Sequence, residues 1–187
     1  MIFLTNDCSP RNEREIVVAA NALVDSQLHG DVMSKIVVGQ KVPDFSLPST
    51  GDKTFLLSDQ AGKKVVLYFY PKDDTPGCTS EGQDFRDLYP EFVGSGADVF
   101  GLSRDSIKKH EKFREKFKFE FDLLSDEDEK VCNLFGVLKD KIMYGRKVHG
   151  VERSTFLIDA DGLLQREWRK VRVKDHVAEV LEAVREL

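Results

Sequence analysis

An uninterrupted apolar run, Val65 to Tyr70, constrains the fold of this chain more than any other feature of its sequence. Because its β-branched and aromatic residues do not alternate with polar ones, the run predicts a strand buried on both faces of a sheet. Pro71 ends this strand, and apolar residues then recur at helical spacing between Cys78 and Val93, which predicts an amphipathic helix. The chain is therefore expected to run from a buried strand through a short loop into a helix whose first turn contains a cysteine.

The remaining segments continue this alternation of strands and helices. Turn-forming residues at 49–52 predict a hairpin over 45–57, and Ser106 is the predicted N-cap of a later helix. The further predicted elements are a strand over 97–102, the helix through Ile107, Phe113 and Phe117, a strand over 121–124, a helix through Val131 and Leu134 that the acidic run 125–128 caps, a hairpin of 154–158 and 163–168, and a closing helix with Val177, Val180, Leu181 and Val184 on its apolar side. This order predicts an α/β protein with a thioredoxin-like fold, in which helices flank a central mixed β-sheet and a β-hairpin lies at the N-terminal end.

Length and composition favour one folded domain. The chain has 187 residues, of which 41% are hydrophobic and 33% charged, a mixture typical of a single globular core. Residues 1–32 differ from the rest: a short helix is predicted within 11–25, but no repeat or linker connects it with the sequence that follows. We therefore expect an N-terminal extension over 1–32 and a single domain over 33–187.

Charge and cysteine content exclude several classes of protein. A net charge of −5 gives no basic surface for a nucleic-acid backbone, and no apolar run approaches the roughly 18 residues of a membrane span. Three cysteines without a CxxC pair form neither a disulfide framework nor a four-cysteine zinc site, and the N-terminus lacks the order of a secretory signal. We expect a cytoplasmic protein, a monomer or weak homodimer, with no metal or other cofactor and no nucleic-acid or membrane partner.

The position of Cys78 favours chemical reactivity. In the first turn of a helix, unpaired backbone N–H groups and the positive end of the helix dipole stabilise a thiolate, which is the nucleophilic form of cysteine. Asp73 and Asp74 precede it in the loop and would oppose that charge, so we expect both carboxylates to face solvent. The alternative is a cysteine that only fills space in the core, since this is the commonest role of a free cysteine.

Three residues of this segment match the signature of a known family. Pro71, Thr75 and Cys78 have the spacing Pro-x-x-x-Thr-x-x-Cys of the peroxiredoxins, and the chain resembles that family from about residue 38 to its C-terminus. The closer resemblance is to the peroxiredoxin Q subgroup, also called bacterioferritin comigratory protein. It is carried by Tyr-Phe-Tyr-Pro-Lys, Thr-Pro-Gly-Cys-Thr, Leu-Leu-Ser-Asp-Glu-Asp and Ser-Thr-Phe-Leu-Ile-Asp. The family's active-site arginine precedes the strand Phe-Leu-Ile-Asp, and Arg153 occupies that place here.

The resemblance implies a thioredoxin-dependent peroxiredoxin, an antioxidant oxidoreductase that reduces hydrogen peroxide and organic hydroperoxides to water or alcohols. The Cys78 thiolate would attack the terminal oxygen of the peroxide and become a sulfenic acid. Thr75 and Arg153 would hold the peroxide in line and stabilise the charge that develops on the leaving oxygen. Pro71 would shape the pocket and shield the intermediate from water.

The positions of a resolving cysteine depart from this subgroup. Many members carry one five residues after the peroxidatic cysteine, where this chain has Gln83, and others carry one on the following long helix, where Arg114 stands. Cys132 is predicted to be a packed structural thiol, and Cys8 lies in the extension. We therefore expect a one-cysteine cycle, in which an external thiol from thioredoxin, glutaredoxin or glutathione reduces the Cys78 sulfenic acid.

Three other functions stay open as alternatives. A thiol–disulfide oxidoreductase would use a second cysteine close by, but Thr75 occupies the place that a CxxC pair would use. A cysteine hydrolase needs a histidine base, and no histidine here belongs to a recognisable dyad signature. The third alternative is a redox sensor or chaperone, in which oxidation of Cys78 changes a binding surface. The four histidines are His29, His110, His149, which is predicted to lie in a loop, and His176.

Overall fold

Residues 36–143 and 146–187 are described by the computed structural model. The predicted extension over 1–32, with Cys8, His29 and the helix within 11–25, lies outside these residues, as does the predicted start of the domain at Met33. Within the described ranges, no helix is long and apolar enough to cross a membrane.

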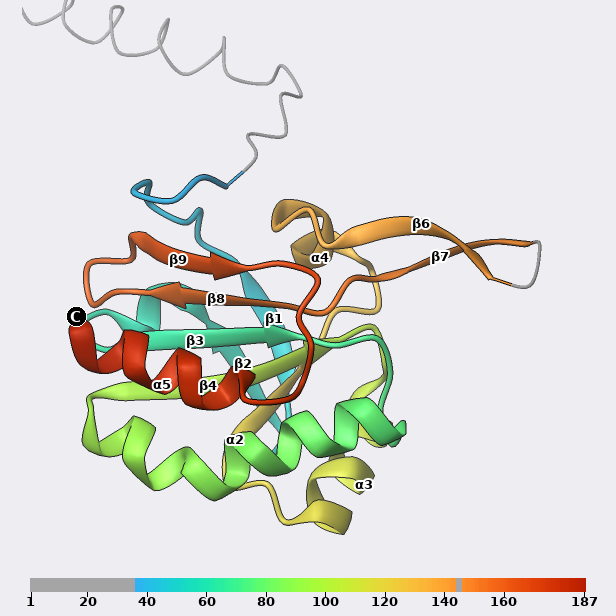
Figure 1. Ribbon diagram of the computed structural model, residues 1–187, viewed down its shortest axis with the longest axis horizontal. Helices are drawn as coiled ribbons and strands as arrows, with labels where there is room; N and C mark the ends of the chain where they lie inside the picture. Colours follow the sequence, from blue (N-terminus) through green and yellow to red (C-terminus); the bar gives the residue numbers. More distant parts are fainter. Residues whose placement is uncertain (1–35, 144–145) are drawn as a thin grey trace, which may run out of the picture. The chain divides into compact units, whose positions relative to one another are not determined.

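A seven-stranded mixed β-sheet forms the centre of the fold (Figure 1). The predicted buried strand is β3 (Lys64–Phe69), which pairs in parallel with β4 (Ala97–Ser103) and antiparallel with β8 (Ser154–Ile158). The strand order is β2-β1-β5-β4-β3-β8-β9, in which the other strands are β1 (Ser46–Ser49), β2 (Lys53–Leu56), β5 (Asp122–Ser125) and β9 (Leu164–Trp168). The predicted central mixed sheet is confirmed, and the N-terminal hairpin β1–β2 lies at its edge.

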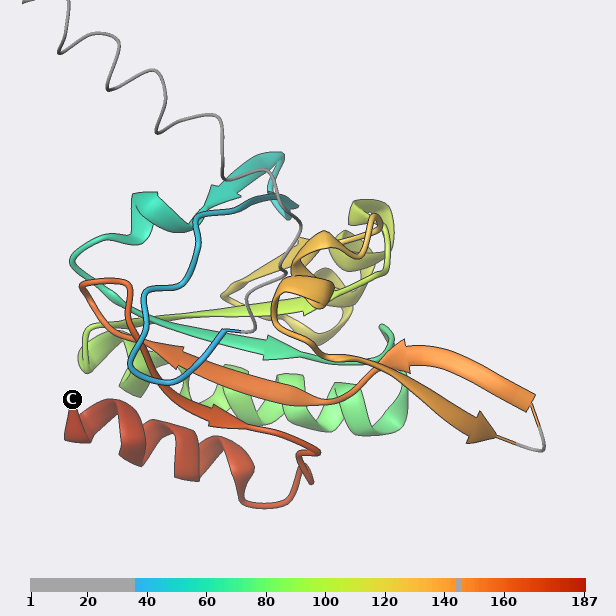
Figure 2. The same ribbon diagram turned by 90° about the horizontal axis from the view of Figure 1, so that it is seen from above.

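The side chains of β3 alternate between two cores, one on each face of the sheet. Val66 and Tyr68 pack with residues of α2, α3 and α5, whereas Val65, Leu67 and Phe69 pack with residues of α4 and the N-terminal hairpin. All five are at most 1% exposed, so the strand is buried on both faces, as its sequence predicts. Figure 2 shows α2 and α5 on one side of the sheet and α4 on the other. The helices are α2 (Pro76–Gly94), α3 (Ile107–Phe117), α4 (Lys130–Leu134), α5 (His176–Glu186) and the 3-10 helix η1 (Leu57–Gln60).

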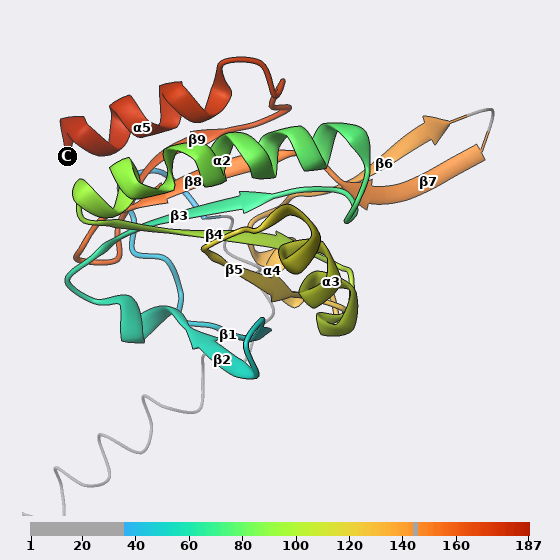
Figure 3. The same ribbon diagram turned by 90° about the horizontal axis from the view of Figure 1, so that it is seen from below.

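The other predicted elements are confirmed with small shifts of their ends. Thr50, Gly51 and Asp52 form the turn of the N-terminal hairpin, between the paired residues Ser49 and Lys53. Gly51 and Asp52 have φ angles of 78° and 55°, left-handed values that occur in tight turns between twisted antiparallel strands. The predicted apolar side of α5 is buried, and α2 and α5 lie side by side along the sheet (Figure 3). The strand predicted over 121–124 begins and ends one residue later.

One antiparallel ribbon was not predicted from the sequence. β6 (Leu138–Met143) and β7 (Arg146–Val151) pair with each other and project from the body of the domain (Figure 1). His149 therefore lies in a strand, and the prediction of a loop at this position is wrong. Its Nδ1 lies 2.8 Å from Asp140 Oδ1 across the ribbon. The two strands read LKDKIM and RKVHGV, so no continuous apolar run and no regular alternation marks them as strands.

Candidate active site

Cys78 lies where the buried strand continues into the helix. β3 ends at Phe69, and the loop 70–75 leads to α2, whose N-cap is Thr75 and whose first residue is Pro76. Proline suits this position, because its missing N–H would have no partner in the first turn of a helix. Cys78 is the third residue of α2, in the first turn as predicted. It is only 2% exposed, so its surroundings decide between a reactive thiol and one that only fills space.

A guanidinium group contacts the Cys78 sulfur. Arg153, which lies between β7 and β8, donates a hydrogen bond from Nη2 to Cys78 Sγ at 3.3 Å and another from Nη1 to Glu81 Oε2. The Glu81 side chain is fully buried, and that of Arg153 is 15% exposed. A cation at hydrogen-bond distance stabilises a thiolate more than a thiol. The fold therefore brings together two predicted site residues, Cys78 and Arg153, and favours a reactive sulfur over an inert one.

Glu81 belongs to this cluster and was not predicted from the sequence. Burial raises the pKa of its carboxyl group from 4.5 to about 7, although Arg153 lowers it. Oε2 pairs with Arg153, while Oε1 is buried and has no hydrogen-bond partner among the described residues. Glu81 follows Cys78 by one turn of α2, on the face that also buries Phe85. A glutamate on the apolar side of an amphipathic helix is the sequence signal that could have identified it.

Replacement of Glu81 by glutamine is expected to reduce the pH dependence of stability between about pH 4.5 and pH 7. Because the folded state raises this pKa, the folded protein holds a proton here that the unfolded chain releases at lower pH. The stabilisation is complete below the unfolded pKa and is lost as the pH rises through about 7. A shift of this size corresponds to on the order of 3 kcal/mol. Chemical denaturation at about pH 5 and pH 8 gives the free energy of unfolding of each variant.

Glu115→Gln is the matched control for this measurement. Glu115 is exposed on α3, so its substitution removes the same charge without removing a buried carboxyl group. We expect Glu115→Gln to lose as much stability as wild type between the two pH values. An equally large loss in Glu81→Gln would contradict the raised pKa of Glu81.

Thr75 and Pro71 lie in the loop that leads to Cys78. Thr75 Oγ1 donates a hydrogen bond to the Lys72 carbonyl oxygen at 3.0 Å, which closes the loop on itself. Pro71 is exposed and lines an open pocket together with Lys72 and Arg104. Among the described residues, no hydrogen bond joins Thr75 to Cys78. The contact of Thr75 and Pro71 with a bound peroxide therefore stays a prediction.

The prediction that Asp73 faces solvent is wrong, whereas Asp74 is exposed as expected. Asp73 is 8% exposed and accepts a hydrogen bond from the Tyr70 hydroxyl at 2.8 Å. Its Oδ2 also lies 2.9 Å from His110 Nδ1. These partners replace the water that an exposed carboxylate would bind, which explains how Asp73 can be buried in the cysteine loop.

The second described cysteine lies on the other side of the sheet. Cys132 packs in the core with Phe69, whereas Cys78 packs in the core on the opposite face. Cys132 is fully buried, and burial raises the pKa of its thiol, so it is packed as predicted. Gln83 and Arg114, at the two positions where the resemblance predicts a resolving cysteine, lie on α2 and on α3.

The described histidines offer no base to Cys78. His176 contacts Thr155 Oγ1 through Nε2 at 2.8 Å, and burial lowers the pKa of its ring to about 4. The rings of His110 and His149 contact other groups, so the geometry gives the cysteine hydrolase no support. Within the described ranges, no group of three or more histidine, cysteine, aspartate or glutamate side chains could hold a metal ion.

The sequence matches a family model and known proteins over most of the length of the chain. The model of the AhpC/TSA family matches residues 38–167. A putative peroxiredoxin Bcp of Coxiella burnetii is 51% identical over 146 residues, which cover 78% of this chain and 97% of that protein. The peroxiredoxin Bcp of Bacillus subtilis is 51% identical over 152 residues, which cover 81% of this chain and 97% of that protein.

Solved structures of related proteins resemble the structure of this chain. A structure of Xanthomonas campestris peroxiredoxin Q has a TM-score of 0.73 at 48% identity and covers 76% of this chain and 90% of its own. A mutant of Xylella fastidiosa PrxQ has a TM-score of 0.78 at 41% identity and covers 82% of this chain and 98% of its own. These similarities confirm the predicted thioredoxin-like fold. The chain belongs to the AhpC/TSA family and, within it, to the Bcp/PrxQ group of peroxiredoxins, which are thiol-dependent peroxidases.

Proposed function

We propose that this peroxiredoxin reduces hydrogen peroxide and organic hydroperoxides with Cys78 as its nucleophile. The observation that carries the proposal is the hydrogen bond from Arg153 Nη2 to Cys78 Sγ, because one guanidinium can stabilise both the attacking thiolate and an anionic leaving oxygen. Trapped intermediate and ligand complexes of the Xanthomonas campestris bacterioferritin comigratory protein, which is 48% identical to this chain, give insights into the alkyl peroxide reduction activity of that protein. This activity of a relative supports organic hydroperoxides as substrates here.

In the oxidative half of the cycle, each bond that forms is matched by a bond that breaks. The Cys78 thiolate attacks the terminal oxygen of the hydroperoxide, so a sulfur–oxygen bond forms while the oxygen–oxygen bond breaks. The bonding electron pair leaves on the other oxygen, which takes up a proton and becomes water or an alcohol. Cys78 is oxidised to a sulfenic acid. Arg153 and the Thr75 hydroxyl hold the peroxide, Pro71 shapes its pocket, and Glu81 orients the second arm of the Arg153 guanidinium.

An external thiol completes the cycle. A thiolate attacks the sulfenic sulfur of Cys78, water leaves, and a mixed disulfide forms; a second thiol then releases reduced Cys78 and a disulfide. Thioredoxin, glutaredoxin or glutathione supplies these thiols. The one-cysteine cycle is supported by Gln83 and Arg114, which carry no sulfur, and by Cys132, which packs on the opposite face of the sheet.

Oxidation of the full chain with one equivalent of hydroperoxide is expected to leave Cys78 as a sulfenic acid without an intramolecular disulfide. Non-reducing mass spectrometry after trapping with a sulfenic acid reagent measures this product. Peroxide turnover coupled to NADPH oxidation, either through thioredoxin and its reductase or through glutathione and its reductase, identifies the thiol.

Each outcome of this experiment has one meaning. A disulfide of Cys78 with Cys132 or Cys8 in most molecules would overturn the one-cysteine cycle. Absence of turnover with every thiol would overturn the peroxidase function, and a single oxidation followed by tight capture of a partner would favour the redox sensor or chaperone.

The chemistry of the cycle also indicates the cellular compartment. A cycle that depends on a reduced external thiol fits a reducing compartment, and three cysteines without a CxxC pair suit it as well. We therefore propose the cytoplasm as its compartment. A monomer or weak homodimer stays a prediction from the sequence. Residues 33–187 form the catalytic domain in this proposal, and residues 1–32 are an extension.

A further inference from the structure

A buried acid–base pair outside the Arg153 cluster connects the cysteine loop to α3. Asp73 lies in that loop between Pro71 and Thr75, and His110 lies in the first turns of α3. The His110 side chain is fully buried and that of Asp73 is 6% exposed, with 2.9 Å between Nδ1 and Oδ2. The chemistry proposed above does not use either group. Burial of two titratable groups is costly unless each has partners, so the pair needs an explanation.

Both ring nitrogens of His110 face hydrogen-bond acceptors. Nδ1 faces the Asp73 carboxylate, and Nε2 lies 3.1 Å from the carbonyl oxygen of Leu124 in β5. The Tyr70 hydroxyl also lies 3.4 Å from Nδ1. His110 therefore connects Tyr70 and Asp73, at the start of the cysteine loop, with β5.

Tyr70 and Asp105 are further partners of Asp73. Burial and the Asp73 charge raise the pKa of Tyr70 well above its usual value, so its hydroxyl keeps the proton that it donates to Asp73. The backbone N–H of Asp73 donates to Asp105 Oδ2 at 2.9 Å. Burial raises the pKa of Asp105, but the hydrogen bonds from Asp73 and Lys109 outweigh it and keep that pKa below its usual value.

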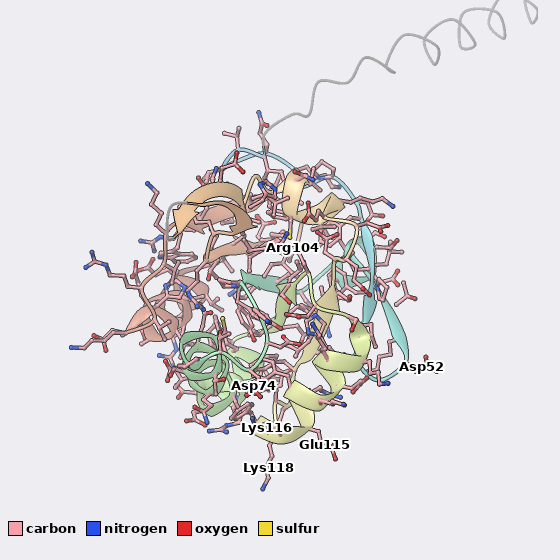
Figure 4. The ribbon with its side chains drawn as sticks, turned by 90° about the vertical axis from the view of Figure 1, so that its right-hand side faces the viewer. Asp52, Asp74, Arg104, Glu115, Lys116 and Lys118 are labelled. Atoms are coloured by element: carbon pink, nitrogen blue, oxygen red, sulfur yellow. The ribbon has the colours of Figure 1, made fainter. Side chains whose placement is uncertain are left out.

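A second contact between the same loop and α3 lies at the surface. Asp74 Oδ2 is 2.7 Å from Lys116 Nζ, and both side chains are about half exposed. Figure 4 shows the two residues side by side. Exposed pairs of this kind contribute little to stability and are screened by salt. Asp74 also has a φ of 56°, a conformation that costs energy for a non-glycine residue. The buried Asp73–His110 pair is thus the stronger restraint on this loop.

We propose that Asp73 and His110 are positioning residues of the peroxidase site, which hold the loop 71–75 so that Pro71 and Thr75 meet the peroxide at Cys78. This inference rests on the proposed function of Cys78. It identifies a requirement for the oxidative half of the cycle that lies outside the residues of the family signature.

Single and double variants test this role. The rate constant for oxidation of reduced Cys78 by hydrogen peroxide is measured by stopped flow in wild type, Asp73→Asn, His110→Gln and the double variant. We expect each single variant to be slower by about 10- to 100-fold, because small displacements of reacting groups cost this much. The double variant should be no slower than the slower single variant, since the two groups act as one unit.

Asp126→Asn is the control for general destabilisation. Asp126 is 1% exposed and accepts the backbone N–H groups of Val131 and Cys132, on the other core of the sheet. We expect it to lower the thermal midpoint without changing the oxidation rate of the folded protein. A wild-type rate in His110→Gln, additive losses in the double variant, or an equal loss in Asp126→Asn would each overturn the positioning role. Failure of wild type itself to consume peroxide would instead overturn the proposed function.

A spectroscopic measurement tests the contact between Asp73 and His110 separately. In ¹⁵N spectra at neutral pH, the Nδ1 resonance of His110 should shift in Asp73→Asn, which keeps the size of the side chain but removes its charge. An unchanged Nδ1 resonance would overturn the contact and with it the positioning role.

Discussion

Replacing Cys78 with serine is expected to reduce peroxide turnover by about 10⁴-fold or more, as loss of the nucleophile does in other covalent catalysts. A serine hydroxyl is not ionised at neutral pH and cannot form a sulfenic acid, so the Arg153 guanidinium would have no thiolate to stabilise. Serine is similar in size to cysteine, and the site already has a polar partner in Arg153. We therefore expect the variant to fold. The measurement is hydrogen peroxide consumption with a thiol reductant, set beside the circular dichroism spectrum.

Cys132→Ser is the matched control for this substitution. Cys132 is fully buried in the core on the opposite face of the sheet, and burial together with the nearby Asp126 carboxylate raises the pKa of its thiol, which disfavours a thiolate. Placing a hydroxyl there should lower stability by about 1–3 kcal/mol while the activity of the folded protein stays at the wild-type level. Full turnover in Cys78→Ser, or its loss in folded Cys132→Ser, would contradict the assignment of the nucleophile.

The fold was predictable where each segment carries its own pattern. The run over β3 indicates burial on both faces, and the apolar spacing after Cys78 indicates a helix that covers one of them. The ribbon of β6 and β7 carries no such pattern, because its strands pair only with each other. Among its residues of described burial, Leu138 and Val151 pack against the core, whereas Lys139, Asp140 and His149 are exposed. The sequence of its two strands therefore predicts a polar loop, and His149 is predicted to lie in this loop.

The candidate site was predictable only in part, because some of its residues depend on partners that lie far away along the chain. Cys78, Thr75 and Pro71 lie in one short segment, and Arg153 was found through its place before a recognisable strand. Glu81 and Asp73 are single acids whose burial depends on a partner far along the chain: Arg153 lies 72 residues from Glu81 and His110 lies 37 residues from Asp73. Without those partners both carboxylates would face water, which is why Asp73 was expected there.

Replacing Arg153 with methionine is expected to slow the oxidation of Cys78 by about 10²- to 10³-fold, the usual cost of removing one donor to a developing anion. The substitution affects both the oxidation rate and the stability of the protein. The thiolate and the leaving oxygen lose their cationic partner, and the buried Glu81 carboxylate loses the only hydrogen-bond donor described for it. Without Arg153 the pKa of Glu81 rises further, so at neutral pH this carboxyl group takes up a proton and keeps no described hydrogen-bond partner. A buried polar group without a partner costs about 1–3 kcal/mol, so Arg153→Met should also be less stable than wild type. Stopped-flow oxidation and chemical denaturation measure the two effects independently.

The double variant Arg153→Met with Glu81→Gln separates catalysis from stability. Glutamine is neutral without taking up a proton, so at neutral pH and above the double variant should recover part of the lost stability while the oxidation of Cys78 stays slow. Arg166→Met is the control, because Arg166 pairs at the surface with Glu186 and should change neither quantity strongly. If oxidation returned to the wild-type rate in the double variant, the effect of Arg153 would be structural. The guanidinium would then hold Glu81 in place without acting on the peroxide.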